Sequence, residues 1–373
     1  MQVQISTVHK RVFGHFPWGS FALLMFWVLI GLANLYSATY RVDGTGLPPL
    51  FKSQLMWFGI GLAFLFLMTR FDYHWLEQLA YPFYFISLLL LSLVFVFGKS
   101  VAGQQNWVSI AGFSFQPSEI AKLALILALA KYFSSRPADQ IYGFRQLFLP
   151  ALLVLPPLTL VLIQKDLGGC LFFVLLFATM SFFMKLKLKV FLIAGLIAGL
   201  AGVFSYNFIL KNYQKDRVKT FLNPESDPKG KGYHLLQSKI AVGSGAWIGK
   251  GYLKGNINKL KFLPERHTDF IFPVLAEEWG FAGSFVLVMS MSLFLLLGLD
   301  SASQCKDLFG ALLAVGVVGL LFWNIVINLG GVLGLMPLTG VPLPFMSYGG
   351  SSLVTMFTAV GVLLNVRMRR YVF

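Results

Sequence analysis

Long apolar stretches, separated by short segments that carry the charges, dominate the 373-residue chain. Because a hydrocarbon core of about 30 Å requires roughly 20 residues of α-helix, each such stretch predicts a membrane-spanning helix. Two spans fit in 308–366, and a further helix over 117–129 is apolar apart from Glu119 and Lys122. The other uncharged runs of suitable length are 18–40, 53–69, 78–98, 146–164, 167–184, 190–210 and 279–299. The pattern predicts an all-α polytopic membrane protein with ten transmembrane helices, in which residues 1–373 form a single integral membrane domain.

The composition also excludes an ordinary soluble protein. Hydrophobic residues make up 57% of the chain and charged residues only 12%, against about 25% charged in soluble domains. The formal net charge is +15. Lys and Arg at membrane edges contact anionic headgroups, and no basic module interleaved with aromatic residues lies outside the predicted spans. We therefore expect membrane lipids, and not nucleic acid, to be the counterpart of this charge.

The distribution of Lys and Arg predicts the orientation of the chain. With a cytoplasmic N-terminus, the inside segments contain thirteen of these residues and the short outside loops contain four. This bias places both termini in the cytoplasm. The segment 211–268, between the seventh and eighth predicted helices, is then a large extracytoplasmic loop with twelve Lys and Arg. Long translocated loops largely escape the rule, so the charge of this loop requires another explanation.

The loop 211–268 combines cations, among them Arg217 and Lys239, with closely spaced glycines in GSGAWIGKGYLKG, residues 243–255. Exposed backbone N–H groups in glycine-rich turns bind anions, so together with Lys and Arg they could hold a diphosphate. The alternative is a loop that rests on anionic lipid headgroups. Both interpretations explain the cations equally well.

A cluster of carboxylates lies where this loop meets the next predicted helix, in LPERHTDFIFPVLAEEWGF, residues 263–281. Four of the fifteen acidic residues of the chain are there, namely Glu265, Asp269, Glu277 and Glu278. A partly desolvated carboxylate has its pKa raised toward the range of a general base. The cationic side chains of Arg266 and Lys122 would oppose such a shift, and the sequence does not decide the balance. His267 is a rival base, although a lone histidine is more often structural.

Two further charged sites interrupt apolar spans. Glu119 and Lys122, in QPSEIAK, are three residues apart, so they share a helix face and can pair. They form either a structural ion pair or a polar wall of a substrate cavity, because charges at bilayer depth normally face a partner or a cavity. Asp166 begins another predicted helix, where an Asp is commonly a cap.

The segment NLGGVLGLMPLTGVPLPFMSYGGSS, residues 328–352, contains three prolines and a closing pair of glycines. No helix continues through such a run. Irregular backbone at membrane depth is tolerated where it is buried in protein or lines a polar cavity. We therefore predict a pocket floored by this segment, in which Ser347 and Tyr348 offer hydroxyl groups to a sugar.

Five motifs in this order resemble one family: QPSEIAK, QKDLG, FLNPESDPKGKGYHLLQS, FLPERHTDFIFPVLAEE and GVPLPFMSYGGSS. They are similar to those of the shape, elongation, division and sporulation (SEDS) polymerases, and the wording ERHTDF resembles the RodA type. The resemblance covers nearly the whole chain. Three positions depart from the usual family pattern: Lys165 replaces Pro, Gly169 replaces Thr and Ala246 replaces Gly.

The resemblance implies ten transmembrane helices in the bacterial inner membrane and polymerisation of lipid II into the glycan strands of peptidoglycan during elongation. It also implies a class B penicillin-binding protein as the cross-linking partner. By its motifs, Asp269 is the catalytic residue, and Glu119 and Lys122 line the same cavity. The Asp of the family's D-L-G motif is Asp166.

The implied reaction fits the residues present. A sugar hydroxyl of one lipid-linked disaccharide displaces the diphosphate-lipid of another, so the hydroxyl needs a base and the leaving anion needs cations. Asp269 would be the base, with Lys239, Arg217 and Arg266 among the cations. A divalent cation such as Mg²⁺ or Mn²⁺ could assist on the diphosphate, but no ligand cluster is evident and no organic cofactor is expected. The alternative function is a flippase that moves the lipid-linked precursor across the bilayer.

Overall fold

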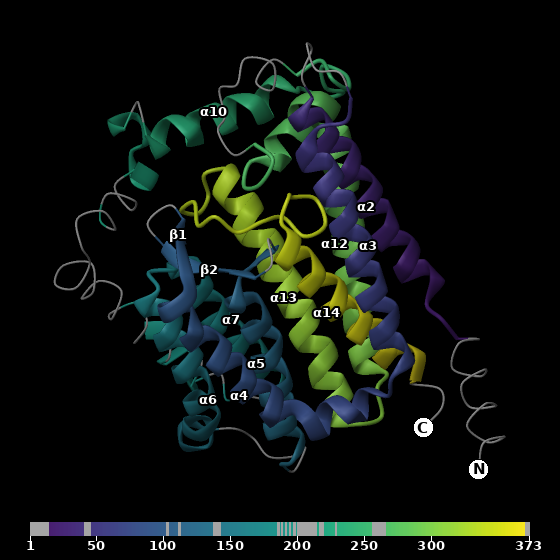
Figure 1. Cartoon of the computed structure of the whole chain (residues 1–373), viewed down its shortest axis with the longest axis vertical. Helices are drawn as coiled ribbons and strands as arrows, with labels where there is room; N and C mark the ends of the chain where they lie inside the picture. The colour runs from purple at the N-terminus through teal and green to yellow at the C-terminus, as the bar shows by residue number, and fades with distance from the viewer. Residues whose placement is uncertain are drawn as a thin grey trace.

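A computed structural model describes the protein over residues 15–40, 46–101, 104–110, 113–136, 143–184, 220–227, 230–255 and 266–369, with isolated residues between 187 and 215 (Figure 1). Three predictions fall on other parts of the chain. Arg217 and Glu265 lie outside the described residues, and so does most of the predicted span 190–210.

The described part of the chain is mainly helical (Figure 1). Its α-helices are α2 (Trp18–Thr39), α3 (Pro49–Arg70), α4 (Tyr73–Phe97), α5 (Pro117–Ser134), α6 (Phe144–Ile163), α7 (Leu167–Phe183), α10 (Lys231–Ser244), α12 (Ile271–Ser303), α13 (Leu308–Val332) and α14 (Gly350–Arg369), with a short 3₁₀ turn η2 (Pro224–Ser226). Seven of them are long and apolar enough to cross a membrane; α7 is shorter, and α5 carries charged residues. Nine of the ten predicted spans coincide with helices in the described residues.

A small antiparallel sheet corrects the all-α prediction. Strands β1 (Gly98–Val101), β2 (Gln104–Ile110) and β3 (Phe113–Phe115) lie side by side in chain order between α4 and α5. Lys99 is opposite Trp107, and Ser109 is opposite Ser114. In β2, Asn106 and Val108 are buried and their neighbours are more exposed, which is the alternation of a strand with one covered face. The strands are too short to produce a recognisable pattern of apolar and polar residues between the two long apolar helices.

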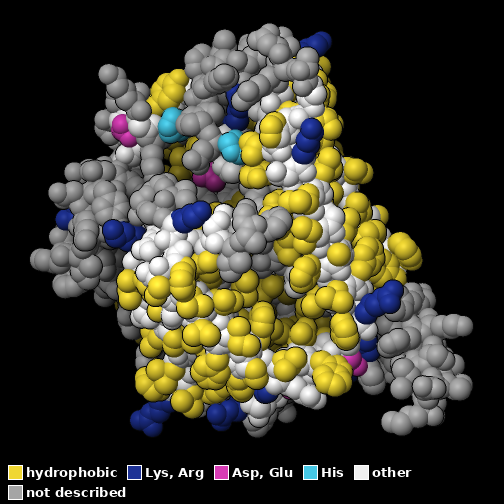
Figure 2. Space-filling view, viewed as in Figure 1, with side chains coloured by type: hydrophobic (Ala, Val, Ile, Leu, Met, Phe, Trp, Pro, Cys, Tyr) yellow, Lys and Arg dark blue, Asp and Glu magenta, His cyan; other side chains and the backbone are white. Residues whose placement is uncertain are grey.

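The burial of the helices separates the interior of the bundle from its surface. In the most apolar stretch of α13, 83% of the residues are buried inside the protein, against 22% in the corresponding stretch of each of α3, α6 and α12. Side chains on the latter helices are therefore exposed although they are apolar, as expected for contact with lipid. Figure 2 shows hydrophobic side chains covering most of the helical surface on one face, with Lys and Arg at its lower edge.

Helix α12 begins eight residues before the predicted span 279–299 and bends at Gly280. Gly280 has φ 66° and ψ −164°, a conformation that only glycine adopts readily. A methyl group built on Gly280 would lie 2.3 Å from the backbone nitrogen of Gly249. Two backbone bonds, from Lys250 N to Glu277 O (3.0 Å) and from Phe281 N to Ala246 O (2.8 Å), hold the neighbouring loop against this bend.

We expect Gly280→Ala to lower the free energy of unfolding by at least ~2 kcal/mol, through backbone strain and the clash with the loop. Thermal melting of the purified protein in detergent measures the loss. Gly59→Ala in α3 is the matched control, because its methyl group would meet nothing within 4 Å. Equal melting temperatures for the two variants would contradict this account of the bend.

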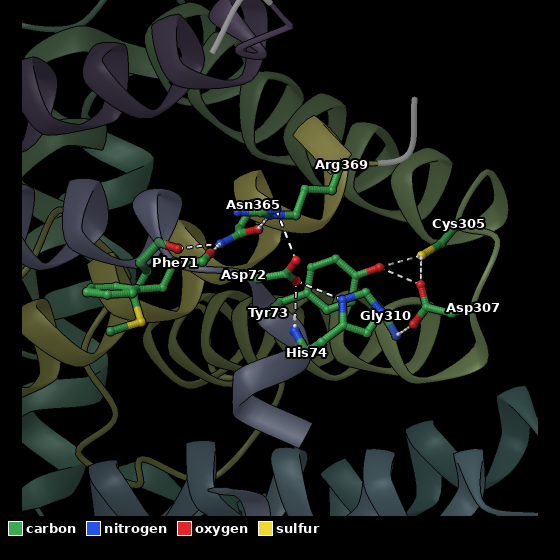
Figure 3. A network of polar contacts seen from close by, with 10 residues as sticks. Phe71, Asp72, Tyr73, His74, Cys305, Asp307, Gly310, Asn365 and Arg369 are labelled. Carbon is green, nitrogen blue, oxygen red and sulfur yellow. Dashed lines mark hydrogen bonds and ion pairs between the residues drawn. The ribbon is translucent and has the colours of Figure 1, made fainter. Parts of the chain in front are cut away.

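A polar network ties together the ends of several helices at the termini end of the bundle, the end that carries the start of α2 and the last turn of α14 (Figure 3). Arg369 at the end of α14 donates to Asp72 (3.1 Å), which caps α4. Tyr73 donates to Asp307, which caps α13. The opposite end of the bundle, which carries the sheet and α10, is called the site end below. Since α14 has 20 residues, the two ends are about 30 Å apart.

The charge of Asp72 gives this network a defined pH dependence. Burial alone would raise the pKa of Asp72, but hydrogen bonds from His74 and the charge of Arg369 outweigh burial and hold the pKa below its ordinary value of 3.8. A carboxylate with a lowered folded-state pKa stabilises the fold above its ordinary pKa, and that stabilisation is lost as the pH falls further. We expect Asp72→Asn, which can still cap α4, to melt a few degrees below wild type at pH 7, and the difference to shrink below pH 3.8. A difference that stays constant down to pH 3 would contradict the role of the charge.

Candidate functional site

Asp269 lies on a turn, residues 266–270, immediately before α12 at the site end, and its side chain is half-buried. Consecutive carbonyl groups of this turn accept hydrogen bonds from distant parts of the chain. Tyr348 N donates to the carbonyl of His267 (2.8 Å), and Ser347 Oγ donates to that of Thr268 (2.7 Å). Asn328 Nδ2 donates to the carbonyl of Asp269 itself (3.1 Å). Three hydrogen bonds therefore hold the backbone that carries the Asp269 carboxylate.

The segment 333–349, which supplies two of these donors, has no helix, as predicted for the proline-rich run. Helix α13 extends through Val332, slightly further than the sequence suggested. Buried Gln54 of α3 holds the segment, because its Nε2 donates to the carbonyl of Ser347 (3.1 Å) and its Oε1 accepts from Gly349 N (3.4 Å). Irregular backbone is thus stabilised by an amide from a neighbouring helix.

Residues 339–340 of this segment lie between Asp269 and the start of α7. Gly340 has φ 77°, and a methyl group built on it would lie 3.6 Å from Asp269 Oδ2. A methyl group built on Gly168 would lie 3.0 Å from the carbonyl oxygen of Thr339. The positive φ favours glycine at position 340, and the tight contact with Thr339 O favours it at position 168. Residues 339–340 are therefore close both to Asp269 and to the start of α7.

Asp166 caps α7, as the sequence indicated, and also joins three elements. Its Oδ1 accepts from Gly169 N (2.9 Å). Its Oδ2 accepts from Gln116 Nε2 (3.1 Å), just before α5, and from Asn106 Nδ2 (3.3 Å) on β2. Lys165 has φ 65°, which proline could not adopt because its ring fixes φ at about −65°. The backbone at this position therefore differs from that of family members that have proline there.

Glu119 and Lys122 form the predicted ion pair within α5. Lys122 Nζ lies 2.7 Å from Glu119 Oε1, and the two side chains are only 4% and 7% exposed. The same ammonium lies 4.3 Å from the centre of the Phe172 ring on α7. Glu119 Oε2 is buried without a hydrogen-bond partner among the described residues. The predicted pairing is confirmed, and the second oxygen of Glu119 is an acceptor that no described group satisfies.

The other two carboxylates of the 263–281 stretch that the structure describes have structural partners. Lys250 Nζ lies 2.7 Å from Glu277 Oε1, and Ser37 of α2 donates to Glu278. Both acidic side chains are buried within α12. Lys250 is therefore engaged by a carboxylate rather than available to a diphosphate. Asp269 differs from these two residues because it lies on a turn and stays half-exposed.

The remaining predicted site residues that the structure describes lie at the same end of the bundle. Lys239 of α10 is exposed, and its ammonium end would be 2.5 Å from a methyl group built on Gly334, just after α13. Arg266 and His267 share the turn with Asp269 and are half-buried. The expectation that Ser347 offers its hydroxyl to a sugar is not supported, because that hydroxyl is buried, donates to Thr268 O and accepts from Leu343 N (2.9 Å).

Sequence reasoning missed three buried amides that hold the site in place. Asn34 of α2 donates to Ile271 O (2.8 Å), and the bonds of Gln54 and Asn328 are described above. Each is a polar side chain inside an apolar span, where an unsatisfied amide is costly. That cost is the signal that would have marked them.

A family model describing FtsW, RodA and SpoVE cell cycle proteins matches residues 18–372. The chain belongs to this family. Among curated relatives, the peptidoglycan glycosyltransferase MrdB of Escherichia coli (strain K12) is 37% identical over 311 residues, which cover 83% of this chain and 84% of the relative. Family members therefore resemble this chain over most of their length.

Two solved structures resemble the fold. One is a chain of a peptidoglycan synthase complex, described as "Structural coordination of polymerization and crosslinking by a peptidoglycan synthase complex". It superimposes on this protein with a TM-score of 0.82 at 35% identity. The rod shape determining protein RodA of Thermus thermophilus gives a TM-score of 0.71, also at 35% identity. Each match covers 95% of this chain and 98% of the other chain. The family and its RodA-type fold, expected from the motifs, are confirmed.

Proposed function

We propose that this protein is a RodA-type peptidoglycan glycosyltransferase that polymerises lipid II during cell elongation. One observation carries the proposal. The half-exposed carboxylate of Asp269 stands on a turn whose backbone carbonyls are fixed by α13 and the 333–349 segment. The names of the family relatives, which include peptidoglycan glycosyltransferases, support the same chemistry.

In the proposed reaction, Asp269 accepts the proton of a sugar hydroxyl on the acceptor. That oxygen forms a bond to the anomeric carbon of the donor while the bond from this carbon to the diphosphate-lipid breaks. The diphosphate leaves as an anion, which cations such as Lys239 and Arg266 stabilise, with Arg217 as a further candidate. Because this leaving group is a stable anion, the reaction needs one carboxylate rather than the two of a glycosidase.

The proposed setting follows from the helix pattern. The site end faces the extracytoplasmic side, residues 190–210 form the seventh of the ten spans, and 211–268 is the large extracytoplasmic loop. Both termini are cytoplasmic, in the bacterial inner membrane. The resemblance to a synthase complex in which polymerization and crosslinking are coordinated supports a class B penicillin-binding protein as partner.

Metal dependence is a separate part of the proposal. Within the described residues, no group of three or more His, Cys, Asp and Glu side chains could hold a metal ion. We therefore place any Mg²⁺ or Mn²⁺ on the substrate diphosphate rather than in a protein site. Polymerisation assays with and without EDTA test this, and a metal that copurifies with the substrate-free protein would contradict it.

Reconstitution separates the enzyme from the flippase alternative. The purified protein is incorporated into liposomes with lipid II, without any transmembrane gradient, and the products are resolved by gel electrophoresis. We expect glycan polymer to accumulate. Translocation of lipid II without polymer would favour the flippase and contradict the proposed function.

A further inference from the structure

The three carbonyl groups that precede α12 are held by donors of different kinds. Two donors, Tyr348 N and Ser347 Oγ, come from the 333–349 segment, which is itself irregular. The third, Asn328 Nδ2, comes from α13, which is the most deeply buried of the apolar helices described above. This third bond ties the turn directly to a helix in the interior of the bundle.

Asn328 uses both hydrogens of its amide nitrogen. One donates to Asp269 O (3.1 Å) and the other to Val341 O (2.7 Å). Both neighbours are carbonyl oxygens, which accept hydrogen bonds. The amide must therefore present its nitrogen, and not its oxygen, to both of them, and this fixes its orientation. The side chain is 4% exposed. A single buried side chain thus bonds both to the backbone of Asp269 and to that of Val341 in the 333–349 segment.

We propose that Asn328 is a positioning residue that fixes the Asp269 carboxylate relative to the 333–349 segment. The inference rests on the proposed function, since it assigns a role in that reaction. A methyl group built on Gly340, one residue before Val341, would lie 3.6 Å from Asp269 Oδ2, so this part of the segment is close to the carboxylate. Loss of the Asn328 bonds would therefore shift the carboxylate and the segment relative to each other. A displacement of about 1 Å at a reacting group can reduce a rate by about 10².

The test compares Asn328→Ala with Asn324→Ala. Asn324 lies one turn earlier in α13 and is 1% exposed, and among the described residues it donates only to Leu320 O (2.7 Å) within its own helix. Both variants remove the same buried amide, but only one touches the Asp269 turn. Lipid II polymerisation is measured per folded protein, with melting temperature as the measure of folding. We expect Asn328→Ala to lower kcat by about 10–100-fold with KM changed less than about threefold, and Asn324→Ala to keep kcat within about twofold.

A second variant covers the case in which Asn328→Ala does not fold. Ser347→Ala removes the donor to Thr268 O while Tyr348 N still holds the adjacent carbonyl, and we expect a smaller fall in kcat with an unchanged KM. The inference is overturned if folded Asn328→Ala matches Asn324→Ala in kcat, or if only Ser347→Ala folds and it keeps wild-type kcat. A wild-type protein that makes no polymer would instead contradict the proposed function.

Discussion

Asp269→Asn is expected to lower lipid II polymerisation by about 10²–10⁴-fold, the usual contribution of a general base. The side chain keeps its size but loses its negative charge, and with it the ability to accept the proton. The three hydrogen bonds described above for the turn involve the backbone carbonyls of His267, Thr268 and Asp269, so the substitution leaves these three in place. Polymer formed per folded protein, at saturating lipid II, measures the effect.

The control for this prediction is folding. Because Asp269 is half-exposed on a turn, the Asn variant should insert, purify and melt as the wild type does. Glu277→Gln is a useful comparison, since it removes a carboxylate of the same stretch that is paired with Lys250. We expect Glu277→Gln to affect stability more than the rate per folded protein. Normal synthesis by Asp269→Asn would remove Asp269 from the role of base.

Lys122→Met is expected to lower the free energy of unfolding by about 3–5 kcal/mol, the largest loss among the variants proposed. The reason is that it leaves the buried carboxylate of Glu119 without its partner. The two side chains are almost inaccessible, so water cannot replace the lost charge. Thermal melting and the yield of monodisperse protein measure the effect. The double variant Lys122→Met, Glu119→Leu removes both charges and should recover most of the loss. A single variant that melts as wild type would contradict a buried pair.

The same double variant separates the two roles considered for the pair. If Glu119 and Lys122 only hold helices together, the stabilised double variant polymerises lipid II at a normal rate per folded protein. We expect a reduced rate instead, because Glu119 Oε2 is a buried acceptor that no described residue satisfies, which is unusual for a purely structural pair. Glu119→Gln should likewise lower the rate through the change in charge.

Much of the helical arrangement could be predicted because membrane depth imposes a simple rule. A helix must be apolar over about 20 residues, so α2, α3, α4 and α13 were visible in the sequence. The rule fails where polarity and length depart from it. Strands β1–β3 are short, and α12 begins within a stretch that carries Glu277 and Glu278, where apolarity alone places the boundary eight residues too late.

The candidate site was predictable in its charged residues and not in its supports. Asp166 and the Glu119–Lys122 pair follow from local rules for caps and helix faces. The bond from Asn328 to Asp269 joins residues 59 positions apart, and no local spacing encodes it. Ser347 illustrates the same limit, since its hydroxyl was expected to face a sugar and is instead used within the protein.

The central claim is that the Asp269 carboxylate accepts the proton in the bond-forming step. The pH dependence of kcat/KM for polymerisation tests it most directly. For the wild type, we expect the rate to fall about tenfold per pH unit on the acid side, because the carboxylate must be ionised to act as a base. The residual rate of Asp269→Asn should be flat over the same range. An unchanged acid limb in Asp269→Asn would show that another group is the base.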